Sequence, residues 1–426
     1  MWIKNKFLNR GNTVKISVKC FLMLALMVLG ASFVVVPRSL AGSDKVITFG
    51  APMSLTGQNS VNGRHARKGY QLAKSVINDI GGIDIGGVKY QIAIKYYDDE
   101  SNPALAAKFA KRLITKDKVA FLLGPYGTST TAAIAPVAEK YRTPFVQGNG
   151  ASLSLFNKGY KYMFAVLSSA DKYLSGALDL AAEKAKTKGV DPASLKIAIA
   201  IENDPFSSDL RDGIINDARA YGMKVVIDEK LPRDFKDMTY ILDKVKSETP
   251  DVFVVSGHEK GADLATRQIA EQKIDVPMLA MTHCEGADIR VRYGLKSDYT
   301  ICATQWDSMM KYSGEIFGSA YNYRKRYELE YGIEPTYQSA ESSAAVVVLA
   351  NAITRAGSLD REKVRTALAE TSLETFFGWV KFDASGKNTA KPMVLRQLYL
   401  GRYIVVAPSG LSKREVIYPR PKWTER

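Results

Sequence analysis

Two loops rich in small and hydroxyl-bearing residues follow apolar stretches that are typical of buried strands. The first loop, Gly124-Pro125-Tyr126-Gly127-Thr128-Ser129, opens a predicted helix. Backbone N–H groups at a helix N-terminus, with the hydroxyls of Thr128 and Ser129 beside them, bind a carboxylate or phosphate well. A helix whose first turn is simply capped by Thr128 would show the same pattern. The second loop, Gly148-Asn149-Gly150-Ala151-Ser152, ends the next strand, and two such loops at one sheet edge favour the anion site.

The chain has three histidines, and two of them follow apolar strands in its second half. His258-Glu259 and His283-Cys284-Glu285 end neighbouring strands. Such a set could bind zinc, but the usual spacings of zinc ligands and of a nucleophilic serine are missing from the sequence. We therefore expect a protein that is not an enzyme and that uses no metal or cofactor. A zinc-dependent enzyme is the less favoured alternative.

Short apolar strands alternate with helical patterns along most of the chain. The predicted strands form two series: Val46–Pro52, Tyr90–Tyr97, Val119–Leu123 and Pro144–Val146, then Lys196–Ile201, Lys224–Ile227, Val252–Ser256 and Pro277–Met281. Strands separated by helices at this spacing predict βαβ units and parallel sheets. The fold class is therefore α/β, with two open parallel-sheet lobes. A ligand cleft is expected between the lobes, at the carboxyl ends of the strands.

The N-terminus has the features of an export signal. Basic residues come first, an uncharged apolar run covers residues 20–36, and Ser39-Leu40-Ala41 supplies small residues at a cleavage site. We expect residues 1–41 to be a signal peptide and the mature chain to begin at Gly42 in the periplasm. An uncleaved segment of this length would instead anchor the protein to the membrane.

Net charge limits the classes of partner that the protein is expected to bind. The formal charge of +15 falls to +9 without the six basic residues of segment 1–41. The sequence has no basic block typical of nucleic-acid binding, so we expect no nucleic-acid partner.

Cys284 and Cys302 remain in the mature chain. An oxidising compartment permits a disulfide between them, but the sequence does not decide whether it forms.

Short motifs recur in order over nearly the whole mature chain. They are Pro52-Met53-Ser54-Leu55-Thr56-Gly57, Gly69-Tyr70, Asp98-Asp99-Glu100-Ser101, Gly124-x-x-x-Thr128, Ala151-Ser152, Gly159-Tyr160-Lys161-Tyr162-Met163-Phe164, Phe382-Asp383-x-x-Gly386 and Gln397. With these motifs, residues 44 to about 408 resemble the branched-chain amino-acid binding proteins of ABC importers, which have a type I periplasmic binding fold.

The resemblance and the order of the strands imply three crossovers between the lobes. We expect them near Val166–Ser169, Ala303–Trp306 and Phe376–Gly378. The first lobe would then comprise residues 42–166 and 304–377. The second lobe would comprise residues 167–303 and 378–426.

The resemblance also implies which residues contact the ligand. These are Thr128, Ser129, Ala151 and Ser152 for the carboxylate, and Phe206, His258 and Glu285 from the second lobe. His258 stands where the family has a tyrosine, and Glu285 lies a few residues past the expected acid. These departures leave the identity of the ligand open. A histidine at the ligand predicts that affinity changes between about pH 5.5 and 7.5.

We expect an exported, monomeric solute-binding protein that captures an amino acid or amino-acid-like carboxylate and delivers it to the membrane subunits of an ABC importer. The alternative is a ligand-sensing periplasmic receptor for an aromatic acid or amide. A regulator of the lactose-repressor type shares the fold class, but the export signal occupies the place of its DNA-binding helices.

Overall fold

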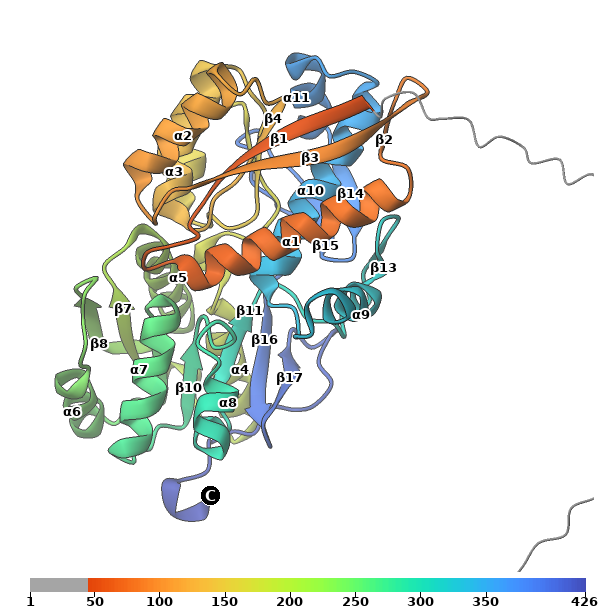
Figure 1. Ribbon diagram of the computed structural model, residues 1–426. Coiled ribbons are helices and arrows are strands. Elements are labelled where there is room, and N and C mark those ends of the chain that lie inside the picture. The colour runs from red at the N-terminus through yellow and green to blue at the C-terminus, as the bar shows by residue number, and fades with distance from the viewer. Residues whose placement is uncertain (1–44) are drawn as a thin grey trace, which may run out of the picture. The chain divides into compact units, whose positions relative to one another are not determined.

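The computed structural model describes residues 45–426, which fold around two separate β-sheets (Figure 1). We call the part of the chain that packs on the first sheet the first lobe and the part that packs on the second sheet the second lobe. The prediction of an α/β fold with two sheet-based lobes is confirmed. The predicted signal peptide, residues 1–41, and the cleavage site before Gly42 lie outside the described residues.

The first sheet has six strands in the order β2-β3-β1-β4-β5-β6. The strands are β1 Lys45–Met53, β2 Ile83–Ile85, β3 Val88–Asp98, β4 Phe121–Leu123, β5 Phe145–Gln147 and β6 Met163–Ala165, and the helices between them are α1 Ser60–Asp79, α2 Pro103–Thr115 and α3 Thr128–Lys140. All neighbours are parallel except β2 and β3. The loops after β4 and β5 therefore meet at one edge, where the Gly127 N–H donates to the Asn149 carbonyl at 3.2 Å.

The second sheet has seven strands in the order β17-β16-β11-β10-β9-β7-β8. The strands are β7 Lys196–Glu202, β8 Lys224–Leu231, β9 Val252–Ser256, β10 Met278–Met281, β11 Ile301–Thr304, β16 Val394–Tyr399 and β17 Arg402–Ala407, and the helices are α4 Ser175–Thr187, α5 Pro205–Tyr221, α6 Thr239–Glu248, α7 His258–Glu271 and α8 Ile289–Tyr293. Strands β7 to β11 pair in parallel, whereas β16 and β17 pair antiparallel.

The segment between β11 and β16 returns to the first lobe. It contains α9 Ala320–Tyr331, α10 Tyr337–Ala356, α11 Arg361–Ala369 and the hairpin strands β12 Ser313–Gly314, β13 Gly318–Ser319, β14 Ser372–Thr375 and β15 Gly378–Lys381. Short 3-10 helices cover Leu153–Lys158, Ala170–Lys172, Pro192–Ser194, Gly294–Ser297 and Trp423–Glu425.

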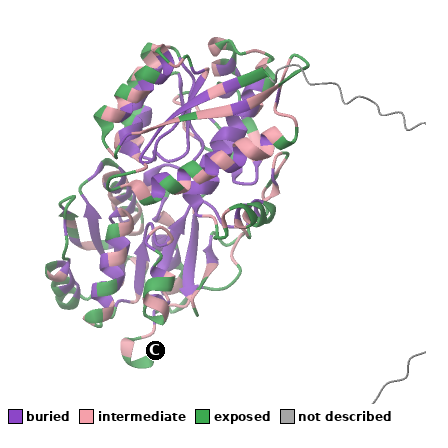
Figure 2. Cartoon of the chain, viewed as in Figure 1, coloured by how far each residue is buried: buried purple, intermediate pink, exposed green. Residues whose placement is uncertain are grey.

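Helix α10 packs closely on α1 and is buried along most of its length. A Cβ atom on Gly69 would lie 2.1 Å from the Ser339 carbonyl oxygen, so only glycine allows the two helices to approach this closely. The Ser343 hydroxyl donates to the Gly69 carbonyl at 2.7 Å. Figure 2 shows buried residues concentrated in the two sheets and exposed residues on the outer faces of the helices.

Three crossing segments join the lobes and are hydrogen-bonded to one another. Ser168 and Gln305, on the first and second crossings, exchange two hydrogen bonds of 3.1 and 3.0 Å. On the third crossing, the Asn388 side chain donates to the Val166 carbonyl at 2.8 Å, and the Lys391 carbonyl accepts from Ser168 Oγ at 2.7 Å. The chain thus passes between the lobes three times.

The third crossing does not lie at Phe376–Gly378, so that expected position is wrong. Lys387 forms a parallel bridge with Ala165, and Phe382 is buried in the core of the first lobe. Gly386, with φ of +79°, holds this turn against Met163, where a Cβ atom would clash with the carbonyl oxygen. We therefore propose residue 388, rather than 378, as the point where the chain returns to the second lobe.

Cys284 and Cys302 form a disulfide, with their Cα atoms 6.0 Å apart. This bond ties the loop after β10 to strand β11 and answers the question that the sequence left open. Within residues 45–426, no single helix has the length and apolar composition to cross a membrane. Helices α10 and α11 meet that criterion only as a pair, bent by 114°.

Candidate functional site

A small cavity lies among the loops at the carboxyl ends of both sheets, and we call it the cleft cavity. Its walls carry residues from the two lobes: Tyr126, Gly127, Thr128, Asn149, Ala151, Tyr173, Phe206, His258, His283, Tyr337 and Glu341. The cavity measures about 20 Å³, which is room for about one water molecule. An amino acid is several times larger, so the lobes must move apart to admit one.

The first turn of α3 faces the cleft cavity. Helix α3 begins at Thr128, and its N-cap residue is Gly127, whose φ of +89° suits glycine. No side chain of the described residues caps this helix end, so the interpretation of Thr128 as the N-cap is wrong. The Thr128 hydroxyl oxygen instead accepts the Ser152 N–H at 3.4 Å. The N–H groups of the first turn are not used by the helix itself, and such a helix end can hold an anion.

The other predicted first-lobe residues take different positions. Ala151 lies in the wall of the cleft cavity, and Ser129 lines an adjoining hollow. Ser152 does not line either space. Its hydroxyl donates to the Asp209 carboxylate on α5, which also accepts the Leu153 N–H at 2.7 Å. In this structure Ser152 links the two lobes.

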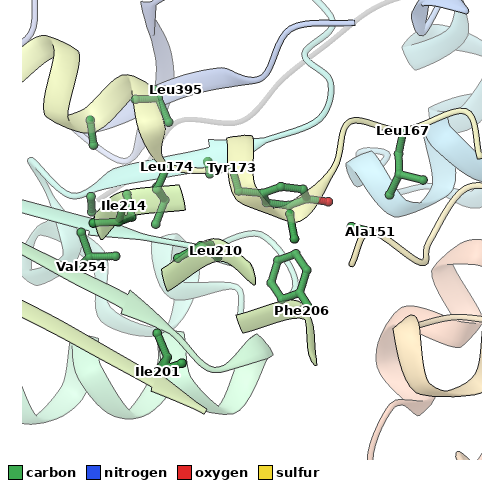
Figure 3. Packing of buried hydrophobic residues seen from close by; sticks show 14 of the residues in the cluster. Ala151, Leu167, Tyr173, Leu174, Ile201, Phe206, Leu210, Ile214, Val254 and Leu395 are labelled. Carbon is green, nitrogen blue, oxygen red and sulfur yellow. The ribbon is translucent and has the colours of Figure 1, made fainter. Parts of the chain in front are cut away.

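Aromatic rings of both lobes surround the cleft cavity. Phe206 lies in the first turn of α5, and its ring centroid is 4.9 Å from that of Tyr173 in a T-shaped contact. Figure 3 shows these two rings next to each other. The Phe206 ring also lies 5.6 Å from His258 and 5.5 Å from His283. The predicted residues Phe206 and His258 therefore both reach the cavity.

The two histidines are held in unusual backbone conformations. His258 has φ of 52° and His283 has φ of 58°. Left-handed backbone costs on the order of 1–3 kcal/mol for residues other than glycine, and it concentrates at functional sites. Tyr126 Oη lies 3.2 Å from His283 Nε2 and 3.5 Å from His258 Nδ1. Tyr126 of the first lobe therefore meets both histidines of the second lobe.

His258 and Asp204 form a charged pair, with Nε2 3.5 Å from Oδ2. Burial alone would lower the pKa of His258, but the hydrogen bond and charge of Asp204 outweigh it and raise that pKa to about 9. Burial and the nearby His258 hold the pKa of His283 well below its usual range. His258 is therefore protonated and His283 neutral at neutral pH. The pH range in which His258 titrates moves from the expected 5.5–7.5 to about 9.

The structure does not bring Glu285 to the cleft cavity. The Glu285 carboxylate pairs with Arg396 on β16 and accepts the Tyr337 N–H at 3.3 Å. The disulfide explains this position, because Cys284 is bonded to Cys302 and Cys302 lies opposite Arg396 in the β11–β16 pair. Arg396 Nη1 also lies 3.2 Å from Asp307 Oδ2. We call Glu285, Arg396 and Asp307 the charged cluster.

The acid that lines the cleft cavity is Glu341, which the sequence analysis missed. Its side chain is 1% exposed, and burial raises its pKa well above the usual range. Glu341 is the only charged residue between Tyr337 and Ile353. A lone acid in a run of small and apolar residues is the signal that could have revealed it. The other missed wall residues are Tyr126, Asn149, Tyr173, His283 and Tyr337.

The described part of the chain offers no metal-binding site. There, no group of three or more His, Cys, Asp and Glu side chains is arranged to hold a metal ion. The sulfur of Cys284 is in a disulfide, and His258 is paired with Asp204. Larger hollows of about 370 and 570 Å³ occur elsewhere, one beside the β12–β13 hairpin and one at the charged cluster.

Comparison with known proteins identifies the family. A family model described as periplasmic binding protein matches residues 46–401. Leu/Ile/Val-binding protein homolog 8 of Brucella suis is 23% identical over 251 residues, an alignment that covers 58% of this chain and 61% of that protein. The chain thus matches less than two thirds of the length of that relative.

Two solved structures share the fold. The branched-chain amino acid transporter substrate binding protein LivJ from Streptococcus pneumoniae, in complex with isoleucine, has a TM-score of 0.72 and 24% identity, covering 85% of this chain and 100% of that one. A solute binding protein of an ABC transporter from R. palustris, in complex with benzoate, has a TM-score of 0.71 and 18% identity, covering 85% and 96%. The family match extends over nearly all the described residues, and the two lobes agree with the resemblance noted in the sequence. The chain belongs to the periplasmic binding protein family.

Proposed function

We propose that the protein is an exported solute-binding protein that captures an amino acid, or a similar carboxylate, and delivers it to an ABC importer. The observation that carries this proposal is the N-terminus of α3 at the cleft cavity, whose walls include Thr128 from the first lobe and aromatic side chains from the second lobe. The N–H groups would hold the carboxylate, and the rings would cover the rest of the ligand. The names of the relatives and the isoleucine-bound neighbour support this class of ligand.

The same proposal includes the setting in which the protein works. It acts in the periplasm after residues 1–41 are removed, as a monomer, without a cofactor and without catalysing a reaction. Sequencing of the exported protein should then find Gly42 as its first residue. Retention of residues 1–41 on membrane-associated protein would favour an anchor instead.

A second candidate is a periplasmic receptor that senses an aromatic acid or amide. The rings of Tyr126, Tyr173, Phe206 and Tyr337 in the cavity walls favour a flat apolar ligand. The benzoate-bound neighbour supports the same possibility.

Thermal unfolding of the chain from Gly42 onward tests the proposed function. Amino acids, their amides and aromatic acids are added one at a time, with and without a chelator. A true ligand at about 100 times its Kd should stabilise the folded state by about 2.7 kcal/mol. Stabilisation by none of these compounds, or stabilisation that the chelator removes, would contradict the proposal.

A further inference from the structure

Two buried oxygen atoms on the first-lobe side of the cleft cavity are unpaired within residues 45–426. They are Asn149 Oδ1 and Glu341 Oε2. Asn149 is 7% exposed, and Glu341 is 1% exposed. Both residues line the cavity. Buried polar atoms nearly always have a hydrogen-bond partner in a folded protein. Two unpaired oxygen atoms in one cavity therefore point to a ligand that supplies the missing partners.

The orientation of the Asn149 side-chain amide follows from its neighbours. The Ser342 hydroxyl donates to the Gln338 carbonyl at 2.7 Å, and its oxygen accepts from Asn149 Nδ2 at 2.9 Å. A flipped amide would place Oδ1 against an oxygen whose hydrogen is already used. Asn149 Oδ1 is therefore an acceptor. Burial raises the pKa of Glu341, but a cation bound beside the carboxyl group lowers that pKa and favours the ionised form, which is also an acceptor. The pair therefore suits a ligand group that is cationic and has several N–H donors.

The two acceptors lie beside the proposed carboxylate site. The Asn149 carbonyl accepts the Gly127 N–H at the start of α3, at 3.2 Å. An α-amino acid carries its ammonium and carboxylate on the same carbon, so adjacent acceptor and donor sites match it. Tyr126 and Tyr337 add aromatic side chains to the walls, and the face of such a ring attracts a cation. Within the protein, the charge of Lys391 acts on Glu341 and lowers its pKa, but the Lys391 side-chain nitrogen donates to the Gln305 carbonyl of the second crossing.

We propose that Glu341 and Asn149 bind the ammonium group of the ligand and thereby select amino acids over carboxylic acids that lack an amine. This inference rests on the proposed function and separates its two candidate ligand classes. It also moves the acidic ligand residue from the second lobe, where Glu285 was expected, to helix α10 of the first lobe.

Calorimetric titration with matched probes tests the inference. Leucine is compared with isocaproate, and phenylalanine with hydrocinnamate, because each pair differs by the ammonium; benzoate is a fifth probe. We expect the better amino acid to bind at least about tenfold more tightly than its partner. Glu341→Gln should reduce that preference about tenfold and leave the affinity for the amine-free acid nearly unchanged. Asn149→Ala should reduce it by a smaller factor, and the exposed Glu330→Gln should leave it intact.

The outcomes separate the two proposals. Equal or tighter binding of the amine-free acids, or a preference that survives in Glu341→Gln, would overturn the ammonium site while the binding function stands. Binding of none of the probes, extended to the other common amino acids and their amine-free analogues, would overturn both. If Glu341→Gln fails to fold, the wild-type preference and the Asn149→Ala variant decide the question.

Discussion

The charged cluster and the cleft cavity each contain a glutamate, Glu285 partly buried and Glu341 buried, and the surroundings of the two glutamates differ. Glu285 pairs with Arg396, which also holds Asp307. Glu341 has an oxygen without a partner in the described part of the chain, and it faces rings and the Asn149 acceptor. A carboxylate paired within the chain is tied to the stability of the fold. A buried carboxylate without such a partner is a candidate for contact with a ligand.

The largest expected effect is on stability and comes from the charged cluster. Arg396→Met leaves the buried Asp307 and the partly buried Glu285 without their cation, which should lower the free energy of unfolding by about 3–5 kcal/mol. Urea unfolding at neutral pH measures it. The exposed Arg402→Met, which alters the same hollow, is the matched control and should change stability little. Equal effects of the two variants would mean that the cluster does not stabilise the fold.

The next effect concerns the charged pair in the cavity and depends on pH. The pKa of His258 is raised to about 9 in the folded protein, above its unfolded value of about 6.5. The pair therefore contributes stability fully below about pH 6.5 and loses it as pH rises through 9. His258→Phe keeps a ring but removes the charge. Its deficit in unfolding free energy should be larger at pH 6 than at pH 10, by on the order of 1–3 kcal/mol.

Urea unfolding of the wild type and His258→Phe at both pH values measures this difference. Asp204→Asn removes the other half of the pair and should weaken the same pH dependence. An identical deficit at pH 6 and pH 10 would show that the His258–Asp204 pair contributes no pH-dependent stability.

The smallest expected effect compares two hydroxyls of the first lobe. Thr128→Val removes a hydroxyl beside the proposed carboxylate site and should weaken ligand binding about tenfold. Ser152→Ala should weaken it about threefold or less, because that hydroxyl is bonded to Asp209. Calorimetry with the best ligand from the thermal screen measures both. A larger loss for Ser152→Ala would restore Ser152 as a ligand contact.

The sequence predicts the part of the site that depends on strand ends. Thr128, Ala151, Phe206 and His258 each follow a strand of a parallel sheet, and all four line the cleft cavity. Parallel topology alone brings such residues to one edge. The sequence pattern also predicts both strand series.

The sequence does not predict the parts that depend on tertiary contacts. Glu285 follows His283 by two residues, but the disulfide at Cys284 turns it toward Arg396. Glu341 reaches the cavity from α10, which is placed by its close packing on α1 at Gly69. Neither the disulfide partner nor the helix contact is encoded in local periodicity.

One measurement tests the different roles of Glu285 and Glu341 most directly. Glu285→Gln and Glu341→Gln are titrated side by side with the amino acid that stabilises the wild type most and with its amine-free analogue. The account predicts that Glu341→Gln loses about tenfold in preference for the amino acid, whereas Glu285→Gln keeps the wild-type preference. Loss of the preference in Glu285→Gln, with retention in Glu341→Gln, would contradict it.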